Sequence, residues 1–154
     1  MKAKKGFTLI ELLVVIAIIA LLGSVAFVIL GPARKRARDS RRKADFKQIN
    51  TAMEVCYNDN NCGDGADKYI DTIQGVNTLT TIGNFLSSVP LDPSNIAPHQ
   101  YTCTEGTDSY YCLYVKSESL TDTWFCSSNK GVFSKTATTY TPSNTDCCGI
   151  DATE

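Results

Sequence analysis

Residues 56–154, the part of this chain with the composition of a globular domain, are poor in histidine, arginine and paired cysteine motifs. His99 is the only histidine in 154 residues, and residues 56–154 contain no arginine and no CxxC pair. A zinc site and a catalytic group of nucleophile, base and orienting residue both lack the side chains they need. The length allows one ordinary domain, which excludes a large multidomain enzyme.

The near-zero net charge of −1 conceals two chain segments of opposite sign. Residues 1–55 contain eleven Lys/Arg against four Asp/Glu, whereas residues 56–154 contain four lysines against twelve acids. The second segment therefore has no basic patch for nucleic acid. Any nucleic-acid binding would have to come from the first segment or from a partner.

One long apolar run, residues 7–30, dominates the first segment, and no second run of this length follows. As a helix its 24 residues would measure about 36 Å, enough to cross a hydrocarbon core of about 30 Å. A cleaved secretory signal fits poorly, because its apolar region is about 7–15 residues long. A plain membrane anchor explains the length but leaves Glu11, an acid inside the run, without a role.

The residues around Glu11 carry a specific resemblance. Lys5-Gly6-Phe7-Thr8-Leu9-Ile10-Glu11 is similar to the class III signal sequence of type IV pilins and pseudopilins. The resemblance implies a leader of residues 1–6, a helical stem of residues 7–57 whose segment 7–30 spans the membrane, and an extracytoplasmic head of residues 58–154. It also implies cleavage by a prepilin peptidase between Gly6 and Phe7, and N-methylation of Phe7.

Assembly is the second implication of the resemblance. In the family, the carboxylate at the position of Glu11 pairs with the N-terminal amine of a neighbouring subunit, here that of Phe7. The expected partners are further copies in a helical filament, membrane lipid, and an inner-membrane pilus or secretion assembly platform. The alternative role for Glu11 is a side chain that merely reaches the cytoplasmic interface.

The stem is expected to continue past the membrane. Gly31-Pro32 should kink or loosen it. Helical spacing then places one apolar stripe toward the head, formed by Phe46, Ile49, Met53 and Cys56. Upstream of this stripe, a face of small residues (Ala33, Ala37, Ser40, Ala44) lies among seven cations (Arg34, Lys35, Arg36, Arg38, Arg41, Arg42, Lys43). This face either admits a neighbouring helix or belongs to a solvated basic helix.

Two features of the sequence predict opposite orientations of the chain in the membrane. Three lysines precede the apolar run and seven cations follow it, so the positive-inside rule alone would place the head in the cytoplasm. Seven cysteines (Cys56, Cys62, Cys103, Cys112, Cys126, Cys147, Cys148) are typical of an exported, disulfide-braced domain. With the family resemblance, the cysteines predict a single-pass inner-membrane precursor with its head outside, and later an extracellular or periplasmic filament.

Disulfide connectivity is only partly suggested by sequence. A hairpin-like turn at residues 105–108 favours a bond between Cys103 and Cys112, and a short Asn-rich loop favours Cys56 with Cys62. Cys126 is left to pair with Cys147 or Cys148, much as many pilins enclose a C-terminal region. One thiol then remains.

The head is predicted to be α+β, with a small antiparallel sheet packed on the stem helix as in type IV pilins. Leu79, Ile82, Phe85 and Leu86 suggest a short amphipathic helix. Strands are expected at residues 100–104, 110–116, 123–127 and 131–134. Four acids (Asp59, Asp64, Asp67, Asp71) supply oxygen ligands suited to calcium, although their spacing does not fit an EF-hand and a solvated loop is the competing interpretation.

Two functional classes follow. The first is a filament subunit without enzymatic activity: a type IV pilin for adhesion, twitching motility or DNA uptake, or a pseudopilin of type II secretion. Pro90-Leu91-Asp92-Pro93 is similar to the segment before the sheet in major pseudopilins, but the Trp-Gly that follows it there is absent. The second class is a membrane-anchored extracellular binding module that does not polymerise.

Overall fold

A computed structural model describes residues 6–60, 62, 65, 67–70, 72, 75–104, 106–140 and 146–151. Its main helix, α1 (Leu9–Tyr57), runs through Pro32 without interruption. Contacts within the chain define two compact units, Met1–Lys35 and Arg36–Glu154, so the division falls inside α1.

The ends of α1 are set by local hydrogen bonds. At the start, Thr8 caps the first turn. At the end, the side-chain amide of Asn58 donates to the carbonyl of Glu54 at 2.9 Å, and the Asp67 amide donates to the Tyr57 carbonyl at 2.8 Å. These bonds satisfy carbonyls that have no partner within the helix.

Five antiparallel strands form the sheet of the second unit, in the order β1-β2-β3-β4-β5. They are β1 (Gly75–Val76), β2 (Thr102–Cys103), β3 (Cys112–Lys116), β4 (Thr123–Ser128) and β5 (Gly131–Thr136). A separate two-stranded ribbon pairs β6 (Asp146–Cys147) with β7 (Ile150–Asp151). The predicted α+β architecture is confirmed.

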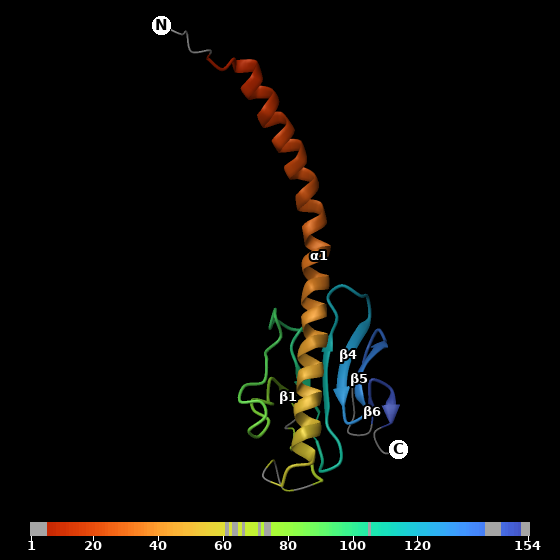
Figure 1. The fold of residues 1–154 in the computed structure, drawn as a ribbon. Helices are drawn as coiled ribbons and strands as arrows, with labels where there is room; N and C mark the ends of the chain where they lie inside the picture. Colours follow the sequence, from red (N-terminus) through yellow and green to blue (C-terminus); the bar gives the residue numbers. More distant parts are fainter. Residues whose placement is uncertain are drawn as a thin grey trace. The chain divides into compact units, whose positions relative to one another are not determined.

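Each face of the sheet is covered by a different part of the chain. The second half of α1 lies across one face (Figure 1), where Phe46, Ile49, Met53 and Cys56 are fully buried. The predicted apolar stripe of the stem is thus confirmed as core. Strand alternation sends Leu113 and Val115 into this core, while Cys112 and Tyr114 face a second cluster with Cys147 and Cys148.

The predicted helix around residues 79–86 is wrong. That segment is a tight turn in which Ile82 and Leu86 form an isolated antiparallel bridge. Gly83 adopts a left-handed φ of +47°, and an added Cβ there would stand 2.4 Å from Cys62 Sγ. A turn of this size also brings residues i and i+4 to one side, which is why the spacing resembled that of a helix.

The predicted strands are present with different bounds. The first two are shorter than expected, and the last two extend to Ser128 and Thr136. The sequence interpretation missed β1, β6 and β7, each of which has two residues. Such short strands give too few positions for an alternation pattern.

Candidate functional site

The segment before α1 exposes the peptide bond at which cleavage is expected. Phe7 has 85% of its surface accessible, and no atom lies within 4 Å of the point where a Cβ on Gly6 would stand. Both residues precede the first helical turn. This geometry leaves the Gly6–Phe7 bond open to an approaching protease.

Glu11 forms a capping box with Thr8. The Thr8 amide and hydroxyl both donate to Glu11 Oε2, at 2.9 and 2.7 Å, and the Glu11 amide donates to Thr8 Oγ1 at 3.3 Å. This is the S/T-x-x-E arrangement that starts helices. The Thr-x-x-Glu spacing was readable in the sequence, so Glu11 has a structural role that the sequence interpretation did not include.

Almost all of the described side chains in the apolar half of α1 are exposed. Residues from Leu9 to Leu30 form a helix long and apolar enough to cross a membrane, and none of its most apolar window is buried within the chain. Phe7, Ile10, Glu11, Val14 and Val15 line one open depression on this surface. The carboxylate of Glu11 therefore lies on an apolar surface that the chain itself does not cover.

In the second unit, Arg42 is the centre of a buried ion-pair cluster, defined here as Arg38, Asp39, Arg42, Asp92 and Glu118. The Arg42 side chain has no accessible surface. Its guanidinium donates to Asp39 at 2.7 Å, to both oxygens of Asp92 at 2.5 and 2.9 Å, and to Glu118 at 2.5 Å. The expectation of a fully solvated basic helix is wrong at Arg42.

Hydrogen bonds surround the acids of this cluster. Asp39 accepts bonds from the hydroxyls and amides of the β3–β4 loop, at Ser117 Oγ, Ser119 Oγ, Ser119 N and Glu118 N. Burial raises the pKa of Asp39, but these donors outweigh it and hold the pKa well below its usual range. The hydrogen bond from Arg38 lowers the pKa of Glu118, burial raises it, and the hydrogen bond from Arg42 lowers it again. The net result is a pKa of about 2. The cluster is therefore fully ionised at neutral pH.

The ion-pair cluster joins three segments that are distant in sequence. Asp39 and Arg42 belong to α1, Asp92 to the segment between β1 and β2, and Glu118 to the β3–β4 loop. Burial lowers the pKa of Arg42, but hydrogen bonds to Asp92, Glu118 and Asp39 outweigh it and the pKa is raised. These contacts fix the start of the head-packed part of α1 against the sheet.

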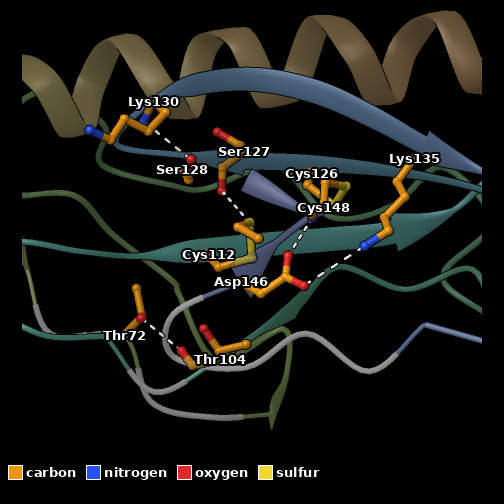
Figure 2. The surroundings of a disulfide bond; sticks show 12 residues. Thr72, Thr104, Cys112, Cys126, Ser127, Ser128, Lys130, Lys135, Asp146 and Cys148 are labelled. Atoms are coloured by element: carbon orange, nitrogen blue, oxygen red, sulfur yellow. Dashed lines mark hydrogen bonds and ion pairs between the residues drawn. A yellow bond between two sulfur atoms is a disulfide. The ribbon is translucent and has the colours of Figure 1, made fainter. Parts of the chain in front are cut away.

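Three disulfides close the head: Cys56–Cys62, Cys112–Cys147 and Cys126–Cys148. The first was predicted, and the third is one of the two alternatives left open for Cys126. Figure 2 shows Cys126 joined to Cys148 close to Cys112, and the ion pair of Asp146 with Lys135 at 3.8 Å. Consecutive cysteines, Cys147 at the end of β6 and Cys148 directly after it, thereby fasten the β6–β7 ribbon to both β3 and β4.

The predicted bond between Cys103 and Cys112 is wrong. In the β2–β3 register Cys103 lies opposite Leu113, and both face the core under α1. Cys112 is one residue out of phase, so its side chain points to the other face. Cys103 is a free, buried thiol.

A family model described as the prokaryotic N-terminal methylation motif matches residues 1–30. The type IV wide pilus major component PilA4 of Thermus thermophilus is 34% identical over 149 residues, which cover 96% of this chain and 99% of that protein. This chain belongs to the type IV pilin family.

Two proteins of Dichelobacter nodosus match shorter parts of the pilin. A probable minor fimbrial protein is 34% identical over 82 residues, covering 52% of each chain. The type IV major fimbrial protein FimA is 39% identical over 67 residues, covering 44% of this pilin and 42% of FimA. No solved structure matches. As a type IV pilin, the chain is a structural subunit and not an enzyme.

The remaining sequence predictions concern the pilin's head. His99 is half-buried, with Nδ1 2.9 Å from the carbonyl oxygen of Lys116. Within the described ranges, no three His, Cys, Asp or Glu residues are grouped so that they could hold a metal ion. Asp64 and Asp71 of the suggested calcium set lie outside those ranges, so calcium binding stays a prediction.

Proposed function

We propose that this type IV pilin, once cleaved between Gly6 and Phe7 and methylated on Phe7, polymerises through α1 into a surface filament. The observation that carries the proposal is the uncovered apolar half of α1, with one carboxylate, Glu11, on its surface. Apolar surface of this extent needs a membrane or other subunits to cover it. The precursor would be covered by lipid, and the assembled subunit by further copies of α1.

Pairing of Glu11 with the Phe7 amine of a neighbouring subunit explains why an acid is tolerated in the run. An unpaired charge deep in a bilayer costs up to about 3 kcal/mol, whereas two opposite charges brought together offset each other's cost. In the precursor, Glu11 Oε2 is held by Thr8, and Oε1 takes part in none of the three capping bonds. The capping box thus orients the carboxylate while leaving one oxygen for a second partner.

A pilus subunit is supported more strongly than a pseudopilin. The relative that matches nearly the whole chain is named as the major component of a wide pilus. The three disulfides and the family's topology support an extracytoplasmic head, against the positive-inside count. We therefore propose an inner-membrane precursor with its head outside, which a prepilin peptidase processes and an assembly platform extrudes.

The deciding experiment separates assembly from helix capping with two matched variants. Glu11→Gln keeps a side chain that can serve in the capping box but removes the charge, whereas Thr8→Val removes the capping hydroxyl and keeps the carboxylate. We expect Glu11→Gln to abolish filaments in electron micrographs of sheared cells, and Thr8→Val to retain them. Mass spectrometry of the purified subunit should show an N-terminal methylated Phe7 in the wild type.

Two results would contradict the proposal. Filaments at normal yield from Glu11→Gln would exclude charge pairing as the assembly contact. A wild-type chain that remains a monomer in the membrane after correct cleavage would instead favour an anchored binding module.

A further inference from the structure

One exposed flank of α1, beside β4, carries a line of cations, named here the basic stripe: Arg36, Lys43 and Lys47. Steps of seven and four residues place these side chains on one side of a helix. All three are exposed, and Lys43 also lies 4.7 Å from the Phe125 ring centroid. Within the described part of the chain, neither Arg36 nor Lys47 forms an ion pair.

The acids packed against this part of α1 do not neutralise these cations. Asp39, Asp92 and Glu118 are bound to the inward-pointing Arg42, and Arg38 takes the rest of Glu118. Asp45 accepts a hydrogen bond from Tyr101 at 2.7 Å on the buried side of the helix. Asp45 also lies 4.0 Å from Arg41, and Glu54 accepts a hydrogen bond from the Tyr69 hydroxyl. The acids of this part of α1 therefore have other partners, and Arg36 and Lys47 remain for another molecule.

Opposite charge gathers at the other end of the same compact unit, where α1 ends. The Asp67 amide is bonded to the Tyr57 carbonyl, and the Asp108 carbonyl accepts from the Tyr69 amide at 2.7 Å. Asp67 and Asp108 are both exposed, and Lys68 pairs with Asp108 at 2.8 Å. In sequence, residues 58–72 and 104–109 contain six acids and one lysine.

These two charged regions are too far apart to compensate each other within one subunit. Tyr57 follows Lys47 by ten residues and Arg36 by twenty-one, which corresponds to about 15 and 32 Å along a helix. Charges separated by more than about 8 Å of salt solution are largely screened at physiological ionic strength. Only a second copy, displaced along the helix axis, can place the acidic end against the basic stripe.

We propose that the basic stripe of one pilin subunit binds the acidic end, represented by Asp67 and Asp108, of another copy of this chain. The inference rests on the proposed filament and names a contact that selects the axial displacement between neighbours. It joins two different surfaces, so it is a head-to-tail contact that propagates into an open filament instead of closing a dimer. Glu11 supplies the contact in the apolar layer, and the basic stripe supplies one at the level of the heads.

Charge exchange tests this contact in the full-length chain. Arg36→Glu/Lys47→Glu and, separately, Asp67→Asn/Asp108→Lys should each lower filament yield by roughly tenfold, because like charges then face each other. Asn is used at position 67 because it tolerates the left-handed φ of 60° found there. Combining the two pairs should restore yield to within about threefold of the wild type, the signature of a direct interaction.

A matched control and a salt series complete the experiment. Lys130→Glu changes charge by the same amount as Lys47→Glu, at an exposed lysine in the β4–β5 turn that does not belong to the stripe, and should leave yield unchanged. Wild-type filaments should release subunits as sodium chloride rises from about 0.1 to 1 M, where the screening length falls to about 3 Å. Leader cleavage and thermal stability must match the wild type in every variant, which shows that folding and processing are intact.

Three outcomes would overturn the inference. The first is wild-type yield from the reversed stripe, and the second is a combined variant no better than its parents. The third is loss of precursor binding to phosphatidylglycerol vesicles by Arg36→Glu/Lys47→Glu without rescue by the acidic-end changes, which would assign the stripe to anionic lipid. Filaments that form but ignore these charges contradict this contact alone, whereas a wild type without filaments contradicts the proposed function itself.

Discussion

The two halves of α1 are both helical, but they differ in whether the chain itself covers their side chains. From Leu9 to Lys35 almost every side chain is exposed, whereas from Arg36 to Tyr57 one face is buried under a sheet of the same chain. In the first half the apolar surface needs cover from outside the chain, and in the second half the chain supplies the cover itself. A substitution should therefore affect assembly in the first half and folding of the head in the second.

The largest expected effect is at Arg42. Arg42→Ala removes the cation that pairs with the buried Asp39 and Asp92, and one of the two that pair with Glu118, so we expect the free energy of unfolding of the head to fall by about 3–5 kcal/mol. Urea unfolding of the detergent-solubilised chain, followed by the fluorescence of Trp124, measures this, since Trp124 is the only tryptophan and lies in β4. The matched change Arg34→Ala, at an exposed cation of the first half, should leave the midpoint unchanged. A loss below about 1 kcal/mol at Arg42 would mean that the cluster does not hold α1 to the sheet.

Lowering the pH is expected to destabilise the head by a smaller amount. The pKa of Glu118 is lowered to about 2 in the folded head and returns to about 4.3 on unfolding, so the unfolded state takes up protons first. The stabilisation is complete above about pH 4.5 and is lost as the pH falls toward 2. We expect a decrease of about 2 kcal/mol over this range in urea titrations.

Glu118→Gln is the control for the acid effect. It should reduce the stability at pH 7 and flatten the decline below pH 4.5, because one of the groups that takes up protons is gone. An unchanged decline would assign the acid sensitivity to other carboxylates of the head.

The smallest effect compares two glycines. Gly83→Ala forces a Cβ into a left-handed position against the sulfur of Cys62, and should lower stability by about 1–3 kcal/mol. Gly23→Ala meets no atom within 4 Å and lies inside α1, so it should leave the unfolding of the head unchanged. Trp124 fluorescence reports both variants. Equal losses would show that the head is not packed more tightly around Gly83 than the first half of α1 is around Gly23.

The sequence predicted some features of the head well and others poorly, for identifiable reasons. The stripe from Phe46 to Cys56 was predicted because a helix repeats its burial every three or four residues, here over about three turns. The turn at residues 79–86 was mistaken for a helix because its apolar positions fall within eight residues, a length of only about two turns. The Cys103–Cys112 bond was mistaken because the residue count of a hairpin does not reveal on which face each cysteine points.

The ion-pair cluster could not be predicted either, because the sequence does not show which of several similar side chains is buried. Seven cations between residues 34 and 43 look alike in sequence, yet Arg42 is fully buried and Arg36 is exposed. Which of them turns inward depends on Asp92 and Glu118, which lie 50 and 76 residues further along the chain. The capping box, in contrast, joins Thr8 and Glu11, which are only three positions apart, and was visible in the sequence.

The sequence by itself determined what depends on neighbouring residues: the cleavage and methylation motif, the apolar run, the helical period and the presence of a disulfide-braced α+β head. Local spacing is sufficient for these, because a helix, a cap or a signal motif is recognised within a few turns. Only the tertiary structure decided which arginine is buried, which cysteines are joined and which charges are left for another subunit. Each of these depends on the register of strands and on contacts between distant segments, and no local pattern records them.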